Sequence, residues 1–380
     1  MPKTQRLLRD QILSDLRKDQ SKINIIYWAR QVGKTTLSDE IIRELGMKTL
    51  RINGDELRYN DILSSQNRLK LESLVSGYDM IFIDEAQRIT NIGVNLKILY
   101  DNFPKLKILV TGSSSFDLSN KVKEPLTGRN FSYKLYPFSF GELWQEYNDF
   151  ELEQEFLESF LIYGSYPDVL LEKNIVTKKQ KLQELATSYL YKDILQLEHI
   201  KHSDKLLKLL KLLAFQIGQE VSINELAKNL ELNNETVNRY IYLLEQSFII
   251  HRLGGFSRNL RKEVSKMDKI YFWDLWVRNV IIDNMNDLEN RNDQGWLWEN
   301  FLINERLKAS GYDQRYFSHY FWRVYTGAEI DYIEEYEGKL HAFEFKWWNK
   351  MVTAPKSFME VYPESEFQVV NRDNFMSFVK

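Results

Sequence analysis

The chain has 380 residues, with 51 Lys and Arg against 54 Asp and Glu, a formal net charge of −3 and no cysteine. This composition excludes a disulfide scaffold and a cysteine-ligated zinc site, and any contact with nucleic acid must come from a local basic patch. No apolar run approaches the roughly 20 residues of a membrane span, so we expect no membrane partner. The absence of cysteine fits a reducing cytoplasm, and the length predicts two or three domains.

The first segment, residues 1–148, alternates apolar runs with helical ones, which is typical of a parallel sheet covered by helices. We expect strands over Asn24–Trp28, Thr49–Ile52, Met80–Asp84 and Leu106–Thr111, with a short one near Tyr133–Tyr136. The predicted fold class is α/β, with helices on both faces of the sheet.

A candidate phosphate-binding loop follows the first of these strands. Its sequence is Arg30-Gln31-Val32-Gly33-Lys34-Thr35-Thr36. A strand, Gly-Lys-Thr and a helix together cradle nucleotide phosphates with backbone N–H groups. We expect Lys34 to reach the β- and γ-phosphates of ATP, and the Thr35 hydroxyl to ligate Mg²⁺.

The loop departs from G-x-x-x-x-G-K-[ST] at one position, because Trp28 stands where the first Gly is expected. That Gly usually opens the loop without a clashing Cβ. A ring here either packs on neighbouring apolar surface or forces the loop from its phosphate-binding shape. On the second alternative, Trp28→Gly tightens nucleotide binding.

Acidic and hydroxyl side chains follow two later strands. Asp84 and Glu85 end the strand from Met80, and Ser113 follows the strand from Leu106. Open α/β sheets bind ligands at this edge. We expect Asp84 to hold Mg²⁺ through water, Glu85 to polarise the attacking water, and Ser113 to lie between Glu85 and the γ-phosphate. Each signal alone has an ordinary structural explanation, but their order along the chain favours an ATP site.

The middle of the chain is helical. We expect a helical lid or linker over residues 149–200 and a winged helix-turn-helix over residues 201–268. Ser222 is the predicted cap of one helix, with Glu225 three residues later, and a second helix runs from Glu235 to about Gln246. A Gly254-Gly255 turn then separates two possible strands.

Contact of this module with double-stranded DNA is one of two open interpretations. Its second helix offers Asn233, Asn234, Thr236, Asn238 and Arg239, and its wing offers Arg258, Arg261 and Lys262. Asn and Arg read base edges, and Lys and Arg bind phosphate. Winged helices also serve as protein–protein modules, however, and Asn-rich helix starts are ordinary caps.

The last segment, residues 269–380, carries a second set of acidic residues. Two strand-like runs form a predicted hairpin that brings Asp331 beside Glu344 and Lys346, which share one face of a strand. Such a group can hold a divalent metal and a water that attacks a phosphodiester, and Glu299 on an upstream helix can join it. The alternative is an exposed hairpin with a cross-strand Glu–Lys pair.

These residues resemble a family of bacterial and archaeal AAA-type ATPases that carry a C-terminal domain of unknown function. The shared segments, in chain order, are Ala29–Leu37, Ile83–Gln87, Thr111–Ser115, Leu126–Arg129, Tyr136–Glu142, Tyr163–Pro167, Tyr189–Ile194, Glu299–Phe301 and the hairpin of Asp331, Glu344 and Lys346. The resemblance implies an AAA-like core, a winged-helix middle and a smaller α/β domain similar to restriction endonucleases. Members typically have Gly at the position of Trp28.

Arg129 has two interpretations within this resemblance. AAA-like proteins can place an arginine near the γ-phosphate, from the same chain or from a neighbour, and the latter implies self-association. The alternative is an arginine that pairs with a surface carboxylate.

Three functions therefore remain open. The first is an ATP-hydrolysing protein that couples its nucleotide state to a DNA-directed C-terminal domain. The second is an ATP-gated signalling or scaffold protein with a degenerate nuclease fold, which the acidic net charge favours. The third is a nucleotide-regulated, metal-dependent nuclease, which the retention of Asp331, Glu344 and Lys346 favours.

Overall fold

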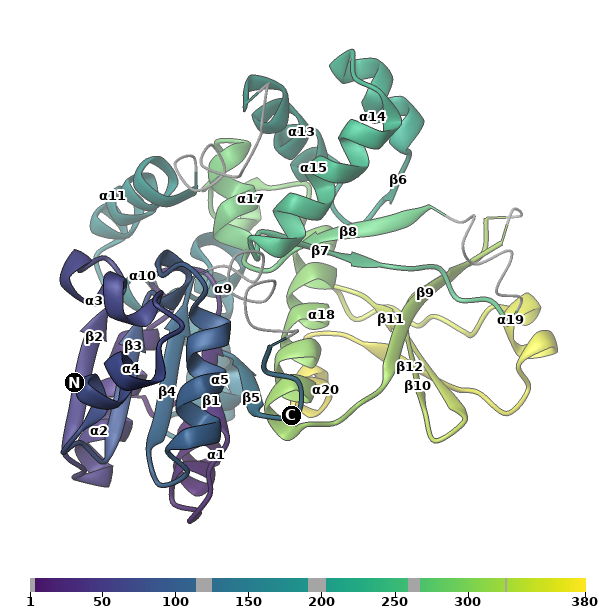
Figure 1. The fold of residues 1–380 in the computed structure, drawn as a ribbon. Coiled ribbons are helices and arrows are strands. Elements are labelled where there is room, and N and C mark those ends of the chain that lie inside the picture. Colours follow the sequence, from purple (N-terminus) through teal and green to yellow (C-terminus); the bar gives the residue numbers. More distant parts are fainter. Residues whose placement is uncertain (1–3, 114–124, 191–202, 259–266, 325–326) are drawn as a thin grey trace. The chain divides into compact units, whose positions relative to one another are not determined.

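The computed structural model describes residues 4–113, 125–190, 203–258, 267–324 and 327–380 (Figure 1). The chain divides into two compact units. Unit 1 holds the residues up to Pro137 together with Gln246–Phe248, and unit 2 holds Phe138–Glu245 together with Ile249–Lys380. Within the described ranges, no helix combines the length and the apolar character needed to cross a bilayer.

Unit 1 is built on a five-stranded sheet of order β2-β3-β4-β1-β5, in which every neighbouring pair is parallel. Its strands are β1 (Ile23–Tyr27), β2 (Thr49–Asn53), β3 (Met80–Asp84), β4 (Lys107–Gly112) and β5 (Asn130–Lys134). Its helices are α1 (Leu8–Leu16), α2 (Lys34–Leu45), α3 (Leu57–Leu63), α4 (Arg68–Val75), the 3₁₀ turn η1 (Ala86–Arg88) and α5 (Ile92–Asn102).

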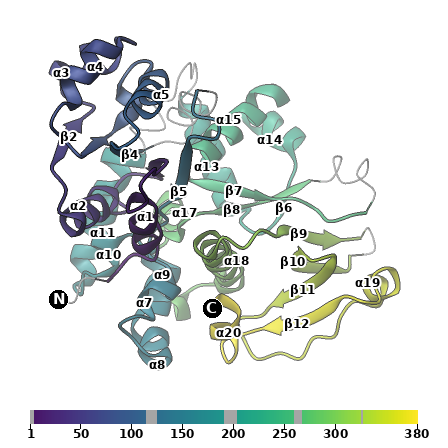
Figure 2. The same ribbon diagram turned by 60° about the horizontal axis from the view of Figure 1, so that its bottom comes forward.

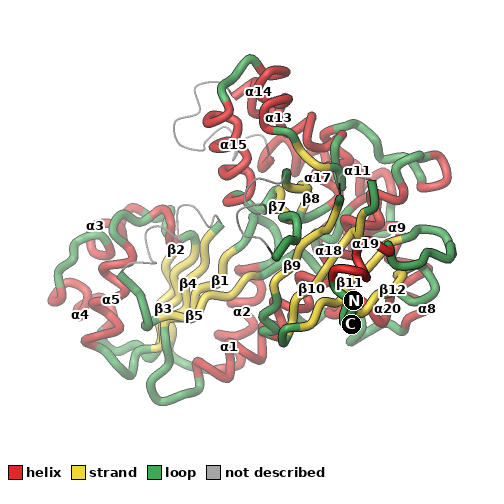
Figure 3. Tube along the Cα trace, turned by 90° about the vertical axis from the view of Figure 1, so that its right-hand side faces the viewer, coloured by secondary structure: helices red, strands yellow, loops and turns green. Residues whose placement is uncertain are grey.

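Both faces of this sheet are buried, which explains the near-continuous apolar runs of its strands. Ile81 and Ile83 face a core that Leu71 of α4 and Leu96 of α5 complete. Phe82 points to the opposite face, because side chains alternate along a strand, and it is buried as well. Figure 3 shows α3, α4 and α5 on one side of the strands, with α1 and α2 on the other. The predicted α/β class is confirmed.

Unit 2 begins with helices and continues into two sheets. Its first helices are α7 (Phe140–Leu143), α8 (Asp149–Glu151), η2 (Leu152–Leu157), α9 (Glu158–Tyr163), α10 (Pro167–Leu170), α11 (Ile175–Leu185), η3 (Ala186–Leu190) and α13 (Ser203–Phe215). A three-stranded antiparallel sheet of order β6-β8-β7 follows, made of β6 (Glu220–Val221), β7 (Ile250–Leu253) and β8 (Asp268–Phe272), with helices α14 (Ile223–Leu230) and α15 (Asn234–Gln246). We call Ser203–Phe272 the α13–β8 module.

The second sheet of unit 2 has the order β12-β11-β10-β9. Its elements are α17 (Leu275–Ile281), η4 (Leu288–Asn290), α18 (Gln294–Asp313), β9 (Ser318–Arg323), β10 (Glu329–Tyr336), β11 (Lys339–Phe345), α19 (Lys356–Val361), β12 (Glu366–Val370) and α20 (Phe375–Val379). Trp322 packs on Phe358 of α19, and Phe345 packs on Phe378 of α20. Figure 2 shows both helices beside the strands of this sheet. The predicted hairpin is present as β10 and β11.

Helix α18 ties the α13–β8 module to the four-stranded sheet. The Asn300 amide accepts from Phe272 N and donates to Phe272 O, both at 2.8 Å, and Asn304 Nδ2 donates to the same carbonyl at 2.7 Å. The two sheets also meet directly, because Phe321 N of β9 donates to Gly254 O at 3.0 Å. The expected boundary at residue 268 coincides with the first residue of β8, a strand that belongs to the sheet of this module.

A buried charge network anchors two segments of the family resemblance on α18. Phe140 N donates to Glu305 Oε2 at 2.7 Å, and Lys308 Nζ donates to Phe138 O at 3.0 Å. Asp274 accepts from Ser165 N at 2.9 Å. Gly164 lies just before that contact with φ of 76°, and a Cβ there would come within 1.8 Å of the Asp274 carboxylate. The contacts of Phe138, Phe140, Gly164 and Ser165 are therefore explained by packing within unit 2.

Candidate functional site

The predicted phosphate-binding loop lies between β1 and α2. Residues 30–33 form the turn, with left-handed backbone at Gln31 (φ 61°) and Gly33 (φ 97°), and Lys34, Thr35 and Thr36 open the helix. Lys34 is buried, and its ammonium group donates to Trp28 O at 2.8 Å and Ala29 O at 2.7 Å. The helix N-terminus and the ammonium group together give this edge of the sheet the positive potential that a phosphate requires.

The Trp28 ring is buried among other aromatic rings. The ring is 1% exposed, stacks on Phe248 with centroids 4.0 Å apart, and meets the edge of Tyr136 at 4.4 Å. The φ angle of Trp28 is not positive, so its backbone conformation does not require a glycine. The first of the two alternatives for this position therefore fits the structure, because the ring is accommodated in the core of unit 1.

Asp84 joins three elements at the C-terminal edge of the sheet. The Thr35 hydroxyl of α2 donates to Asp84 Oδ2 at 2.9 Å, and the Thr111 hydroxyl of β4 donates to Oδ1 of the same carboxylate. A hydroxyl and a carboxylate are the hard oxygen ligands that Mg²⁺ takes beside nucleotide phosphates. The residues fit the ion, and the structure brings together both side chains that we predicted for it.

Gln87 links the other two predicted residues of this edge. Its Nε2 donates to Glu85 Oε2 and, at 2.7 Å, to Ser113 Oγ, and Ser113 N lies 3.4 Å from Gln87 Oε1. Glu85 has φ of 50°, an uncommon conformation for a non-glycine residue. Sequence reasoning gave Gln87 no role, although it belongs to the shared segment Ile83–Gln87. Gln87 therefore fixes the Glu85 carboxylate and the Ser113 hydroxyl relative to each other.

Arg129 lies at the opposite edge of the sheet. Its carbonyl accepts from Ile23 N, at the start of β1, and its guanidinium donates to Asp101 at 2.8 Å. The five residues of β1 rise about 3.3 Å each, which separates Arg129 from the phosphate-binding loop by roughly 16 Å. The geometry therefore supports a surface ion pair and keeps Arg129 from the phosphate site of its own chain. A role toward a neighbouring chain stays a prediction.

Three asparagines that we considered for DNA contact, one just before α15 and two within it, are engaged within the fold. Asn233 Oδ1 accepts from Thr236 N at 2.7 Å, and Asn234 Nδ2 donates to Asn224 Oδ1 at 2.6 Å. Asn238 Nδ2 donates to Asn234 O at 3.0 Å. Arg239 is exposed, and the exposed Arg258 lies over the Tyr362 ring at 5.4 Å. Arg261 and Lys262 lie outside the described residues.

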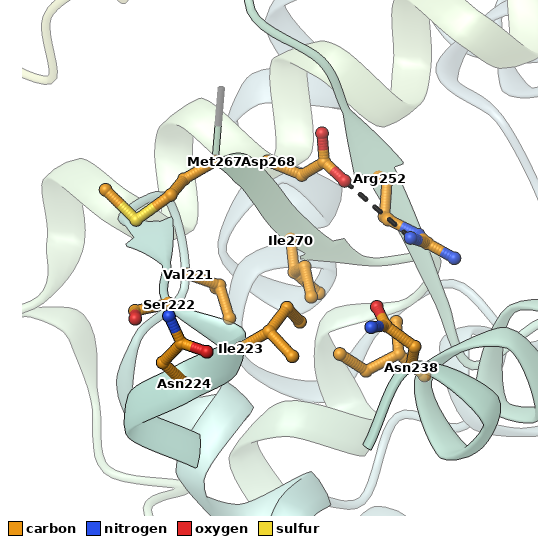
Figure 4. Close-up of a pocket in the computed structure, with 10 residues that line it drawn as sticks. Val221, Ser222, Ile223, Asn224, Asn238, Arg252, Met267, Asp268 and Ile270 are labelled. Atoms are coloured by element: carbon orange, nitrogen blue, oxygen red, sulfur yellow. Dashed lines mark ion pairs between the residues drawn. The ribbon is translucent and has the colours of Figure 1, made fainter. Parts of the chain in front are cut away.

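A pocket of about 260 Å³ opens between the two helices and the sheet of this module (Figure 4). It is lined by Val221, Ser222, Ile223, Asn224, Asn238, Ile241, Arg252, Met267, Asp268 and Ile270. Arg252 donates to Glu245 at 2.6 Å and lies 3.7 Å from Asp268. Burial raises the pKa of Asp268, and the guanidinium opposes that rise. The charge of Arg252 is thus balanced by the carboxylates of Glu245 and Asp268, both in the same module.

The acidic residues of the C-terminal hairpin form a buried cluster with two lysines. Asp331 accepts from Phe345 N at 2.8 Å, and Glu344 accepts from Lys346 Nζ at 2.6 Å. Glu299 on α18 accepts from Lys269 Nζ at 3.2 Å and from Tyr271 OH at 2.5 Å. Both of these donors come from β8, and sequence reasoning had given neither of them a role. The available signal was their spacing, since a lysine and a tyrosine two residues apart share one face of a strand.

Burial is the main cause that raises the pKa of Glu299 to about 7, with the Lys269 ammonium opposing the rise and the Asp331 carboxylate adding to it. Burial also raises the pKa of Asp331 and of Glu344. Among the described residues, no three His, Cys, Asp or Glu side chains gather closely enough to hold a metal ion. The carboxylates of Glu299, Asp331 and Glu344 are therefore not gathered as one three-acid ligand set, and a metal held by Asp331 and Glu344 alone stays a prediction.

Three regions of the chain match known protein families. Residues 20–144 match the family described as "AAA domain", residues 154–287 match a domain of unknown function (DUF8612), and residues 294–379 match another (DUF4143). The chain therefore carries an AAA domain that includes β1 to β5. The AAA-type part of the predicted resemblance is confirmed.

Relatives of known sequence extend over most of the chain. An uncharacterized protein of Methanocaldococcus jannaschii is 25% identical over 315 residues, which are 76% of this chain and 69% of the relative. One of Mycobacterium tuberculosis is 27% identical over 320 residues, which are 83% of this chain and 68% of the relative. Among solved structures, RuvB of Thermotoga maritima covers 64% of this chain and 88% of its own, with 17% identity and a TM-score of 0.35.

Proposed function

We propose that this chain binds ATP with Mg²⁺ at the C-terminal edge of β1, β3 and β4 and hydrolyses it. One observation carries the proposal: the Thr35 hydroxyl lies 2.9 Å from the Asp84 carboxylate, beside the loop that holds the Lys34 ammonium. The match of residues 20–144 to an AAA domain supports it independently.

The residues have separate roles in this proposal. Lys34 neutralises the β- and γ-phosphates, while Thr35 and Asp84 hold Mg²⁺, whose charge offsets that developing on the phosphate oxygens. Glu85 accepts the proton of the attacking water. Gln87 and Ser113 fix the position of the Glu85 carboxylate, which is a positioning role.

The effector of the ATPase in this proposal is unit 2, and its target is DNA. The chain leaves β5, which pairs with β1, and a few residues later enters the segment whose Phe138 and Phe140 are anchored on α18. We infer that a movement of β1 and its loop on nucleotide binding is passed through β5 and the next few residues to α18, the helix that binds both sheets of unit 2. The exposed Arg239 and Arg258 are the side chains to which this proposal assigns phosphate contact.

An ATP-gated scaffold is the second candidate, and one observation favours it. The asparagines of α15 serve as caps and internal partners, and their amides are not all available to read base edges. A protein partner of the α13–β8 module requires no such readout.

ATP turnover and binding test the proposal. Lys34→Ala should abolish tight ATP binding, and Glu85→Gln should keep binding but lose hydrolysis by on the order of 10²-fold or more. The exposed Lys70→Ala and Glu72→Gln on α4 are matched controls and should behave as the wild type. Native turnover in Glu85→Gln would show that another group activates the water. Turnover that rises with double-stranded DNA would favour the DNA-directed form over the scaffold.

A further inference from the structure

Lys269 is a buried cation of unit 2 that the ATPase proposal does not use. It stands on β8 with its side chain 3% exposed, 3.2 Å from the Glu299 carboxylate. The ammonium group also lies over the Phe321 ring, 5.4 Å from its centroid. It therefore has little access to water, and its charge is balanced by carboxylates.

The surrounding carboxylates are each occupied by a donor within the fold. Tyr271 OH donates to the same Glu299 oxygen at 2.5 Å. Asp331 accepts a backbone N–H, and Glu344 accepts from Lys346 at 2.6 Å. Buried carboxylates without such partners are strongly destabilising. Lys269 and Lys346 together therefore supply the positive charge that lets three acids share this interior.

Strand β8 fixes the ammonium group in place. It pairs with β6 on one side and β7 on the other, so that Lys269 faces Glu220 in one register and Leu253 in the other. Asn300, the neighbour of Glu299 on α18, holds both backbone groups of Phe272 at the end of the same strand. The Lys269–Glu299 pair thus joins two elements whose backbones are already tied together.

We propose that the Lys269 ammonium group, paired with Glu299, is the permanent cation of this cluster, so that the C-terminal sheet holds its acids without a metal ion. A divalent ion beside Glu299 would meet the repulsion of a buried ammonium group only a few ångströms away. The cluster then serves to join β8 to α18 and the four-stranded sheet.

The test is Mn²⁺ binding by the nucleotide-free full chain, with free Mn²⁺ followed by electron paramagnetic resonance and thermal unfolding measured in parallel. Wild type and Asp331→Asn should bind the same amount of Mn²⁺, and saturating Mn²⁺ should leave the difference between their melting temperatures unchanged. Lys269→Met should lower the melting temperature, gain one Mn²⁺ per chain and regain melting temperature on Mn²⁺ addition. Lys269→Met/Asp331→Asn should lose that gain.

A second variant keeps the test decisive if Lys269→Met does not fold. Lys269→Met/Glu299→Gln removes both charges of the pair and should fold, with a melting temperature closer to the wild type than that of Glu299→Gln alone. A wild-type chain that binds one Mn²⁺ that Asp331→Asn loses would overturn the proposal. A Glu299→Gln variant with the same melting temperature as Lys269→Met/Glu299→Gln would also overturn it, because the charge of Lys269 would then be stable without the Glu299 carboxylate.

Discussion

Trp28 shows how one residue can depart from a motif without removing the site. The ring fills space between Phe248 and Tyr136 in unit 1, and its carbonyl oxygen accepts from Lys34 Nζ. Within the phosphate-binding loop, residue 28 contributes its backbone carbonyl to Lys34, and any amino acid at this position has that carbonyl. The side chain is free to serve the core.

This packing reverses the simple expectation for Trp28→Gly. Removing a fully buried ring leaves a cavity, and we expect the free energy of unfolding to fall by about 3–5 kcal/mol, with no gain in ATP affinity. Urea unfolding and titration calorimetry measure the two quantities. The exposed Trp348→Gly is the matched control and should cost much less. Tighter ATP binding with unchanged stability would mean that the ring obstructs the loop.

Residues that carry a motif could be predicted from the sequence, and residues that complete a site by contact could not. Lys34, Thr35 and Asp84 follow strands at set positions, and parallel strands bring their ends to one edge. Gln87 and Lys269 act through partners that only the folded chain brings near. A glutamine or a lysine has many ordinary partners, and the sequence does not distinguish among them.

Helix α15 is the element on which the DNA proposal depends. If it docks on a duplex, Arg239→Ala and the pair Arg258→Ala/Arg261→Ala should weaken binding and flatten its salt dependence, by about one unit of slope per lost phosphate contact. Fluorescence anisotropy over a salt series measures this. Arg68→Ala, an exposed change on α4 of unit 1, should leave the slope unchanged. Absence of binding at every salt concentration would assign the helix to a protein partner.

Strand positions and the pairing of strands in hairpins were predictable at this scale, but the pairing of strands far apart in the chain was not. The apolar runs gave β1 to β4 to within one residue at each end, and the two helices of the α13–β8 module were also placed. Ser222 caps α14 as predicted, accepting from Glu225 N at 3.3 Å. The pairing of β8 with β6, by contrast, spans the whole helical segment between them, and such non-local pairing leaves no periodic signal in the sequence.

The pH dependence of stability is a property of unit 2 as a whole, because Asp274 lies in the network that holds its segments together. Burial raises its pKa from 3.8 to about 6, with Lys308 and hydrogen bonds from Ser165 and Trp276 opposing the rise. The folded state therefore binds the proton more tightly than the unfolded state. The stabilisation is complete below pH 3.8 and is lost as pH rises through about 6.

We expect Asp274→Asn to remove this dependence. At about 1.4 kcal/mol per pKa unit, the stability of the wild type relative to the variant should fall by about 3 kcal/mol between roughly pH 3 and pH 7. Urea unfolding across that range checks it, with the exposed Asp204→Asn as control. A constant difference between wild type and Asp274→Asn would mean that the carboxyl group stays ionised throughout.

The hydrogen bonds between α18 and β8 have a consequence for chains in which the two elements come from different parents. A recombination crossover between Phe272 and Gln294 would separate Glu299 and Asn300 from the strand that they bind. The half that contains α18 would then carry the buried Glu299 carboxylate without the Lys269 ammonium group. The half that contains β8 would carry the buried Lys269 without the Glu299 carboxylate. A chimera joined there should therefore unfold at a lower temperature than one that keeps Lys269, Glu299 and Asn300 together.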